Sequence, residues 1–470
     1  MKILIIGDYP VFFGGVTNYT RPLAEELSKY HDVYYLYSCT RTENFDFKRM
    51  RITKSVPIEN SKVNFFELIN PPTRYPNYHN LDLDTGNWLD EIFIKYLDEI
   101  KPDVIHIHEI FGFSSNLIVI AKSKGIKVFV TVHEYWWLCS HRVMIDFNKK
   151  ICNGPEDISK CVHCVKRINF VPQSKIKIIV RKRVKWLHKI YMKFLKRQKL
   201  NDLTVHLDYR NEIYKNNKAT KLYNILENRL LKNISYLNKC DLIIAVSSDV
   251  KKILSAYGVN PKIILVQHIG STIANKKIVH VKKVDSRRIV FGFIGGVTYY
   301  KGVHQLVEAF LLLPEELKEK SCVEIWGKYD DGYVGEITNK FEKSSYFKNI
   351  KFHGLFTPKD IQHISNQIDI SVLPSLCADT APQTIFESFS SGLPIIAPFI
   401  GGFPDFIING KNGLTYEAGE VEKLSQCLKK IIEEPGLIDK LRINIPKLKV
   451  IDQNVLELLD IYERESQLQR

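Results

Sequence analysis

The sequence predicts an α/β protein made of two doubly wound, Rossmann-like domains that face a cleft. Three observations support this prediction. Apolar β-branched runs recur along the chain, helix-like stretches alternate with them, and the whole rhythm restarts after a polar, lysine-rich segment. Continuously apolar strands separated by helices indicate parallel sheets covered on both faces. With 470 residues, 45% of them hydrophobic, the chain can form roughly two to three domains with full cores.

The predicted strands fall into two series. The first comprises KILIIG, DVYYLYS, DVIHIHE, KVFVTVHE, DLIIAVS and KIILVQH, with helices predicted at residues 16–29, 88–99 and 249–257. The second comprises RIVFGFIGG, CVEIWG, NIKFHG, DISVLPS, LPIIAP and NGLTY. The polar stretch Gly270–Arg288 separates them and predicts a linker. We therefore expect domains at 1–270 and 271–450, and a final helix at 451–470 that packs back on the first domain.

Polar residues gather where the predicted strands end, which is where doubly wound sheets bind ligands. In the first series these are Gly14-Gly15, His108, His133 and Ser247-Ser248; in the second they are Lys301 and the stretch DTAPQTIFE. Helix N-termini also point to this edge and bind anions through their backbone N–H groups. The sequence thus predicts a ligand site between the two series.

The formal net charge of +15 calls for anionic partners. Thirteen Lys/Arg and no Asp or Glu lie between Val165 and Leu200, inside an expected helical insertion at 165–237. Residues 176–197 have apolar side chains at three- and four-residue steps between basic ones, a pattern typical of attachment to anionic lipid. An ordinary helix with a solvated basic face is the alternative. Nucleic acid is disfavoured, because no recognition motif accompanies the charge.

The chain carries no apolar stretch near the roughly 18 residues of a membrane-spanning helix. Nine cysteines without an export signal favour a reducing compartment. We expect a cytoplasmic protein, peripheral on the inner face of the membrane if the basic helix binds lipid.

Four of the cysteines lie within 26 residues of loop-rich sequence directly after the His133 strand. They are Cys139, Cys152, Cys161 and Cys164. Four thiols ending in Cys-x-x-Cys have the ligand number and spacing of a structural tetrahedral zinc site. His141 and His163 are alternative ligands, and reduced, half-buried thiols are the alternative without metal. We expect structural zinc in a loop at 139–164 that shapes access to the cleft.

Two acids, Asp379 and Glu387, surround a predicted helix start in DTAPQTIFE, where Pro382 suits the first turn and Thr380 or the preceding loop would cap it. Asp379 then lies in the loop and Glu387 on the helix, so they do not share one helical face. Nothing in this spacing indicates a hydrolytic pair. The pair suits ligand holding, because carboxylates accept hydrogen bonds from sugar hydroxyls. A capping Asp379 and a solvated Glu387 are the alternative.

The segment from Asp379 to Leu414 resembles the donor-binding motif of family 4 retaining glycosyltransferases of the GT-B fold. The matching pieces are Asp379, Glu387, Gly392-Leu393-Pro394-Ile395, Gly401-Gly402 and Asn412-Gly413-Leu414. FIGGVTYYKGVHQLVEAF resembles the family's Lys-Gly motif, and DYPVFFGGVTNYTRPLAEEL and TVHEYWWL extend the similarity to the first domain. A subset of the family has a similar cysteine pattern.

The resemblance implies a role for each matching residue. Glu387 binds the ribose, Asp379 contacts sugar hydroxyls, Lys301 neutralises the diphosphate, and His133 approaches the sugar from the acceptor-side domain. Gly14-Gly15 and Gly401-Gly402 offer backbone amides to phosphate or acceptor. The acceptor hydroxyl attacks from the face that the diphosphate leaves, and no catalytic metal is expected. The implied substrates are a nucleotide-diphosphate sugar and a hydroxyl of a glycan or lipid-linked acceptor, as in polysaccharide biosynthesis.

Two positions depart from the family pattern. Asp379 stands where the family usually has Glu, and Gly296 stands where a phosphate-binding Arg is common. Losing the guanidinium removes a planar bidentate clamp. These departures leave open a weakly active or non-catalytic protein that binds nucleotide sugars, as well as another GT-B enzyme such as an epimerase or phosphorylase.

Overall fold

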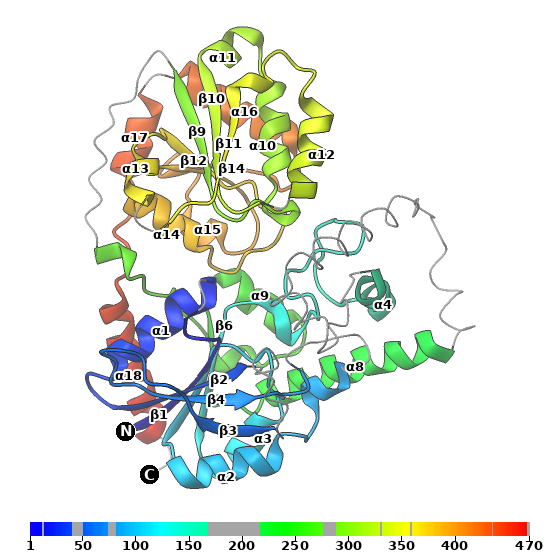
Figure 1. The fold of residues 1–470 in the computed structure, drawn as a ribbon, viewed down its shortest axis with the longest axis vertical. Coiled ribbons are helices and arrows are strands. Elements are labelled where there is room, and N and C mark those ends of the chain that lie inside the picture. Colours follow the sequence, from blue (N-terminus) through cyan, green and yellow to red (C-terminus); the bar gives the residue numbers. More distant parts are fainter. Residues whose placement is uncertain are drawn as a thin grey trace.

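The computed structural model describes residues 1–11, 14–39, 50–73, 81–167, 217–275, 288–329, 331–357, 360–434 and 436–467. Two α/β domains are stacked along the long axis of the molecule, with the N-terminal sheet below and the C-terminal sheet above (Figure 1). Within the described ranges, no helix is both long and apolar enough to cross a membrane.

The N-terminal domain is built on an eight-stranded sheet of order β3-β4-β2-β1-β5-β6-β7-β8. Neighbouring strands are parallel except for the β3–β4 pair, which is antiparallel. The strands are β1 Lys2–Gly7, β2 Asp32–Cys39, β3 Arg51–Lys54, β4 Asn64–Ile69, β5 Val104–Ile107, β6 Lys127–Val132, β7 Leu242–Ala245 and β8 Ile264–Val266.

The C-terminal domain is built on a six-stranded, fully parallel sheet of order β11-β10-β9-β12-β13-β14. Its strands are β9 Ile289–Ile294, β10 Ser321–Trp326, β11 Ile350–Gly354, β12 Ile370–Val372, β13 Ile395–Pro398 and β14 Gly413–Tyr416. Both sheets therefore have the doubly wound order, in which strands cross over through helices.

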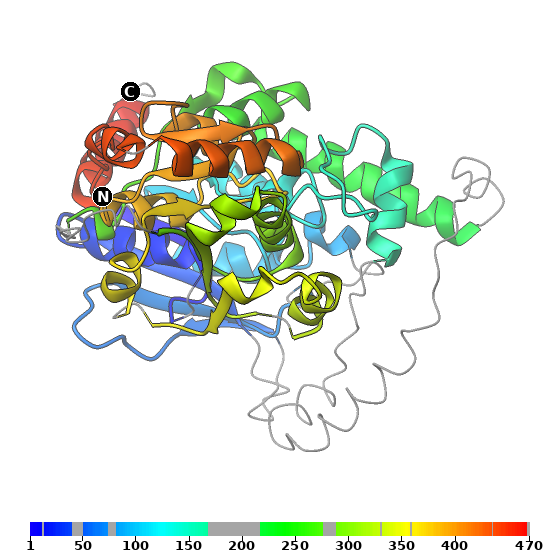
Figure 2. The ribbon, with the colours of Figure 1, turned by 90° about the horizontal axis from the view of Figure 1, so that it is seen from above.

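Helices connect the strands and lie on both sides of the sheets (Figures 1 and 2). The first domain contains α1 Gly15–Leu27, α2 Asp90–Ile100, α3 Leu117–Ser123, α4 Ile158–Arg167, α8 Asn217–Leu237 and α9 Ser248–Ala256. The second contains α10 Val303–Leu311, α11 Glu315–Glu319, α12 Asp331–Phe341, α13 Ile361–Ser365, α14 Gln383–Ser390, α15 Phe403–Phe406, α16 Val421–Glu433 and α17 Leu437–Ile443. Short 3₁₀ turns include η2 Leu81–Thr85, η3 Tyr135–Trp137 and η7 Tyr299–Lys301.

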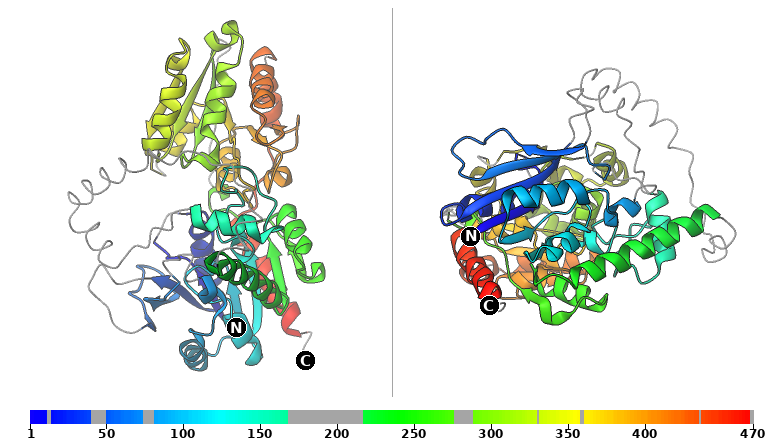
Figure 3. Two further views of the ribbon diagram at one scale, coloured as in Figure 1. Left: turned by 90° about the vertical axis from the view of Figure 1, so that its right-hand side faces the viewer. Right: turned by 90° about the horizontal axis from the view of Figure 1, so that it is seen from below.

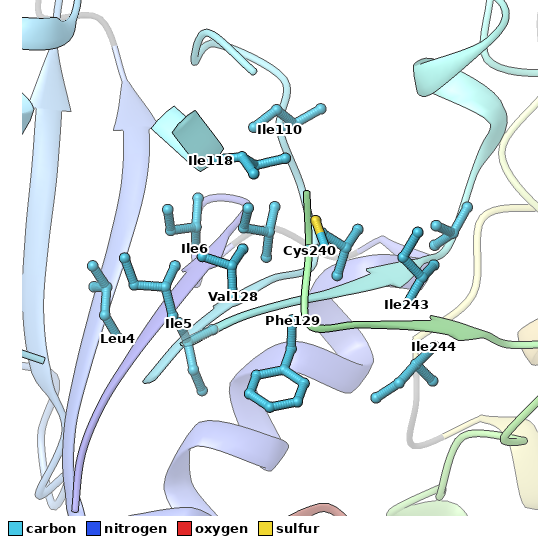
Figure 4. Close-up of a cluster of buried hydrophobic side chains, with 14 of the residues drawn as sticks. Leu4, Ile5, Ile6, Ile110, Ile118, Val128, Phe129, Cys240, Ile243 and Ile244 are labelled. Atoms are coloured by element: carbon cyan, nitrogen blue, oxygen red, sulfur yellow. The ribbon is translucent and has the colours of Figure 1, made fainter. Parts of the chain in front are cut away.

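The strands form because their side chains are apolar on both faces of the sheet. Leu4, Ile5 and Ile6 of β1 are fully buried, and they pack with Val128 and Phe129 of β6 in one cluster (Figure 4). Burying a large aliphatic side chain contributes about 1.5–3 kcal/mol to folding. The ends of these rigid strands are therefore fixed points from which functional side chains can project.

The last helix, α18 Ile451–Gln467, leaves the second domain and lies beside α1 in the first (Figures 1 and 3). The hydroxyl of its Tyr462 lies 2.5 Å from Nδ1 of His106. Tyr19 of α1 donates to Asn454 Oδ1 at 2.7 Å, and the backbone N–H of Gly270 donates to the same oxygen at 3.0 Å. The expected domain boundaries, after residue 270 and after residue 450, stay predictions.

The structure differs from the sequence-based expectations in two respects. Strands β3 and β4 were not predicted: the four residues of β3 are half-buried or exposed and carry no clear apolar alternation, and the apolar run of β4 is interrupted by Glu67. Thr380 does not cap α14: its hydroxyl donates instead to the carbonyl oxygen of His133 at 2.5 Å, and Pro382 occupies the N-cap position. The basic residues 176–197, most of the insertion at 165–237 and most of the linker lie outside the described residues.

Candidate functional site

The most direct contact between predicted site residues joins Lys301 and Asp379. Nζ of Lys301, at the end of η7, donates to both carboxylate oxygens of Asp379, at 2.9 and 2.7 Å. Burial alone lowers the pKa of Lys301, but the charges of Asp379 and Cys377 and the hydrogen bond to Asp379 give a net increase. The Ser375 hydroxyl also donates to Asp379, at 3.0 Å. Lys301 is therefore a fixed cation beside the start of α14.

Glu387 lies on α14 beyond this ion pair. Burial raises the pKa of its carboxyl to about 7. No side chain or backbone group among the described residues makes a hydrogen bond or ion pair with this carboxyl. A half-buried acid on the helix that begins beside Lys301 is free to accept hydrogen bonds from a bound molecule, and ionisation becomes easier when such donors arrive.

The Gly401-Gly402 turn lies against the same loop. The N–H of Gly402 donates to the carbonyl of Asp379 at 2.7 Å. A Cβ on Gly402 would stand 1.9 Å from the Thr380 carbonyl oxygen, and Gly401 has a φ of +58°. Larger residues therefore cannot replace this pair without moving the loop that holds Asp379.

Gly14 and Gly15 open α1 in the other domain and face this region. Both are exposed, and Gly14 occupies the N-cap position without a side-chain cap. A Cβ built on Gly15 would lie 3.9 Å from Cγ of Gln383, the first residue of α14. The N-termini of α1 and α14 are thus neighbours across the junction, and within the described residues neither has a side-chain cap for its helix-end N–H groups. Two positive helix ends favour an anionic group between them.

His133 follows β6 and meets the second domain through its backbone, because Thr380 donates to its carbonyl oxygen. Burial lowers the pKa of His133 to about 3, so the ring is neutral. Its Nε2 lies 3.1 Å from Nδ1 of His108, and Tyr19 packs against both rings. Burial and the neighbouring His106 and His133 hold the pKa of His108 well below its usual range. His133 is a neutral hydrogen-bonding group.

Sequence reasoning missed an acidic group beside these histidines. Glu109 and Glu134 directly follow His108 and His133 and share Arg142, whose Nη1 lies 4.0 Å from Glu109 Oε2 and 3.3 Å from Glu134 Oε1. Burial, with the charge of Glu109, raises the pKa of Glu134 to about 8, although Arg142 opposes this shift. The two acids could have been predicted, because they follow strands β5 and β6 at the edge where doubly wound sheets bind ligands. Arg142 lies in the cysteine-rich loop, where no local sequence pattern predicts its position.

Further contacts join the two domains between α15 of the second domain and the start of α9 in the first. Asp405 Oδ2 accepts from the backbone N–H of Ser248 at 2.7 Å and lies 3.0 Å from Nε2 of His268. Burial alone raises the pKa of Asp405, yet these hydrogen bonds and the His268 charge give a net decrease. The junction is therefore held by hydrogen bonds on the side of His133 and on the side of Ser248.

The four clustered thiols line a single pocket, which Cys139, Cys152, Cys161 and Cys164 share with His141. Burial, followed by the charges of the neighbouring thiols, raises the pKa of Cys161 to about 12. In the parts of the chain that are described, no three His, Cys, Asp or Glu side chains are arranged to hold a metal ion. The thiols are thus close neighbours, but in this structure their side chains do not have the geometry of a metal-binding site.

The remaining predicted residue, Gly296, follows β9 and is exposed. A Cβ built there would meet nothing within 4 Å. The structure therefore brings Lys301, Asp379, Gly401-Gly402, Gly15 and the His133 backbone together around the start of α14. Glu387 follows along that helix, and the cysteine-rich loop adds Arg142 from the side.

Comparison with known proteins finds similarity to glycosyltransferases in both domains. The model of the glycosyl transferases group 1 matches residues 275–448, and that of glycosyltransferase family 4 matches residues 13–191. An uncharacterised glycosyltransferase of Methanocaldococcus jannaschii is 26% identical over 206 residues, which cover 42% of this chain and 51% of the relative. The capsular polysaccharide biosynthesis glycosyltransferase CapM of Staphylococcus aureus is 23% identical over 166 residues, covering 33% of this chain and 40% of CapM.

The matched part thus spans about half or less of these relatives. Among solved structures, Anabaena HepE in complex with UDP aligns with a TM-score of 0.61 at 15% identity, covering 98% of this chain and 100% of HepE. At this identity the likeness establishes the fold: two facing Rossmann-like domains of the GT-B type.

Proposed function

We propose that this chain, a member of the family 4 glycosyltransferases, moves a sugar from a nucleotide-diphosphate donor to a hydroxyl of a glycan or lipid-linked acceptor. The anomeric configuration of the sugar is retained. The observation that carries the proposal is the Lys301–Asp379 ion pair at the start of α14, beside the His133 strand end. HepE, which shares the fold, binds UDP and UDP-glucose. The intact pair favours an active enzyme over a protein that only binds nucleotide sugars.

Each group has a role that its surroundings support. Lys301 neutralises the diphosphate, and Asp379, held by Lys301 and Ser375, accepts hydrogen bonds from sugar hydroxyls. The helix ends at Gly15 and Gln383 provide N–H groups for phosphate. His133 contributes a neutral ring, which can orient a hydroxyl without repelling the cation of Lys301.

The reaction needs little covalent help from the protein. The acceptor oxygen forms a bond to the anomeric carbon on the face from which the bond to the diphosphate oxygen breaks, and the acceptor proton passes to that departing oxygen. Negative charge grows on the diphosphate as the bond breaks. A cation fixed before the reaction stabilises this charge with little reorganisation, and such groups contribute strongly to rate.

Glu387 provides the direct test of the donor site. Glu387→Ala should weaken binding of the preferred nucleotide sugar by about tenfold or more, because two hydrogen bonds from the ribose lose a charged acceptor. With the pKa of Glu387 at about 7, affinity in the wild type should rise between pH 6 and pH 8. Titration calorimetry with UDP, GDP and ADP sugars measures both effects. A pH dependence that persists in Glu387→Gln would contradict this assignment.

Gly296 offers a gain-of-function test. Gly296→Arg should tighten donor binding by about three- to tenfold, since a guanidinium adds charge-assisted hydrogen bonds to phosphate. The position has open space for a side chain, and its φ is not in the left-handed region. Gly335→Arg, also in open space but on α12, is the matched control and should leave affinity unchanged. Equal affinity of Gly296→Arg and wild type would place Gly296 away from the phosphates.

For the cysteine-rich loop we propose structural zinc held by Cys139, Cys152, Cys161 and Cys164. The shared pocket and the Cys-x-x-Cys spacing support it, and thiolates at such high pKa values need a cation to form. Purified protein should contain about one zinc per chain, and chelation should lower the midpoint of thermal unfolding. Metal-free protein of unchanged stability and activity would contradict the proposal, and Cys427→Ser, a thiol in the other domain, is the control.

We also propose peripheral attachment to anionic lipid through the basic segment 176–197, which rests on the sequence alone because the segment lies outside the described residues. Its charge and amphipathic spacing support this reading, and a lipid-linked acceptor would be presented at such a surface. Cosedimentation with anionic but not neutral vesicles is the corresponding measurement; equal binding to both would contradict the electrostatic version.

A further inference from the structure

The cysteine-rich loop contains a hairpin whose tip is held in one conformation. Ile145 and Ile151 pair as an antiparallel bridge, and Asp146 and Lys150 close the turn through a backbone bond of 2.8 Å. Asp146 Oδ1 accepts from the N–H groups of Asn148 and Lys150, at 2.8 and 2.9 Å. Lys149 then adopts a left-handed φ of +63°. These bonds fix the backbone from which the Lys149 side chain projects.

The hairpin begins and ends next to the thiol cluster. Cys139 precedes it and Cys152 follows it, and the N–H of Cys152 donates to the Met144 carbonyl at 2.9 Å across its base. Phe147 near the tip lies with its ring centroid 5.7 Å from that of His163, which stands between Cys161 and Cys164 on α4. The position of the tip therefore depends on the cysteine-rich segment beneath it.

The tip reaches the other domain at Tyr299. Nζ of Lys149 lies 4.4 Å from the centroid of the Tyr299 ring, within the range of a cation–π interaction. The same ring stacks on His304 at 4.8 Å with an interplanar angle of 19°. His304 is held in turn, because its Nδ1 lies 2.6 Å from the Tyr333 hydroxyl. Tyr299 thus has contacts from both domains.

Tyr299 is the first residue of the turn that ends at Lys301. This turn is closed by a bond from the N–H of Gly302 to the Tyr299 carbonyl, at 2.9 Å. Any shift of the Tyr299 ring is therefore transmitted through one 3₁₀ turn to the backbone of Lys301. A misplacement of reacting or charge-bearing groups by about 1 Å is enough to cost a large part of their effect.

We infer that Lys149 is a positioning residue for the donor site: from its hairpin it covers Tyr299, steadies the Tyr299–Lys301 turn and keeps Nζ of Lys301 placed for the diphosphate. The inference rests on the proposed function, since it assigns Lys301 to the diphosphate. It also assigns a function to the cysteine-rich loop, which places the Lys149 ammonium group against the turn of the other domain that contains Lys301.

The chain provides a matched pair for the test, because Lys149 and the adjacent Lys150 are both exposed and only Lys149 has a recorded contact with Tyr299 in the described structure. Lys149→Met should weaken binding of a nucleotide sugar by about three- to tenfold, the size of one cation–π contact. It should lower kcat as well, because a displaced Lys301 also stabilises the departing diphosphate less well. Lys150→Met should stay within about twofold of wild type, the size of an ordinary surface substitution. Melting temperatures should not change in either variant.

Conservative and coupled variants separate positioning from a general structural effect. Lys149→Arg and Tyr299→Phe keep the cation and the ring, and both should retain wild-type affinity. In a Tyr299→Leu background, Lys149→Met should cause no further loss, because the two residues act through one contact. Calorimetric titration with the preferred nucleotide sugar measures all six variants, which are five single variants and one double variant.

The outcomes distinguish the two proposals. If wild-type protein binds the nucleotide sugar but Lys149→Met matches Lys150→Met, or if Lys149→Met and Tyr299→Leu add independently, the positioning role is wrong and the donor site stands. If the folded wild type binds no nucleotide sugar, the proposed function fails and the inference falls with it.

Discussion

Lys301→Ala should reduce kcat/KM by about a hundredfold to a thousandfold, the effect of removing one preorganised group that stabilises developing charge. Lys301 makes both of its side-chain bonds to Asp379, and the charge of Asp379 favours its protonated form. Without it, the departing diphosphate loses a fixed cation, and Asp379 loses its charged hydrogen-bond donor while keeping the hydrogen bond from Ser375.

Steady-state kinetics with the preferred donor measure this effect, and the Asp379→Asn variant is the comparison. Asp379→Asn keeps the cation, so it should lose contacts to the sugar while binding of the free nucleoside diphosphate stays close to wild type. A Lys301→Ala variant that stays folded and within about tenfold of wild-type kcat/KM would remove Lys301 from the chemistry, because one lost charge contact in the transition state costs more than that.

Arg229→Met should lower the free energy of unfolding by about 3–5 kcal/mol, the usual result of removing one partner from a buried ion pair. Arg229 of α8 is 2% exposed, and its Nε donates to Asp84 Oδ2 at 2.7 Å. Nη2 donates to the Trp136 carbonyl at 2.7 Å, and the guanidinium lies 4.3 Å from the Trp136 ring centroid. Burial already raises the pKa of Asp84 despite Arg229, so losing the cation leaves a costly unpaired acid.

Denaturant unfolding followed by tryptophan fluorescence measures this loss. Replacing both partners, as Arg229→Met with Asp84→Leu, should recover much of the stability, since a buried pair is often no better than apolar packing. A loss below about 1 kcal/mol in the single variant would show that water reaches Asp84 or that the region relaxes, because unpaired buried charges otherwise cost more. Arg229 also supports the turn that follows Glu134, so activity should fall along with stability.

The fold class was predictable because buried parallel strands are apolar on both faces. Short apolar runs such as residues 2–7 and 127–132 show this pattern in the sequence itself. The predicted two-domain α/β architecture is confirmed. Strands β3 and β4 were not predicted, since β3 is an edge strand of half-buried or exposed residues and the apolar run of β4 contains Glu67. Thr380 was expected to cap a helix, but its hydroxyl donates to the carbonyl oxygen of His133 in the other domain. No local sequence pattern predicts a partner so distant in the chain.

The candidate site was predictable where residues follow strand ends or match the family motif, as Lys301, Asp379 and Glu387 do. Their pairing was not, because Lys301 and Asp379 are 78 positions apart and only the folded sheet brings them together. The same holds for Arg142 and Lys149, which come from an irregular loop and act on strand ends and on a turn of the other domain. Loops carry such groups without any periodic signal.

The most direct test of sugar transfer is to follow the anomeric signals by proton NMR while the protein acts on α-linked nucleotide sugars. We expect one donor to be consumed, and the first-formed product, whether glycoside or free sugar, to have the α configuration. Consumption should nearly cease in Lys301→Ala. A first-formed β product, or a donor that binds the folded wild type but is never consumed in the presence of glycan and lipid-linked acceptors, would contradict retaining sugar transfer by this protein.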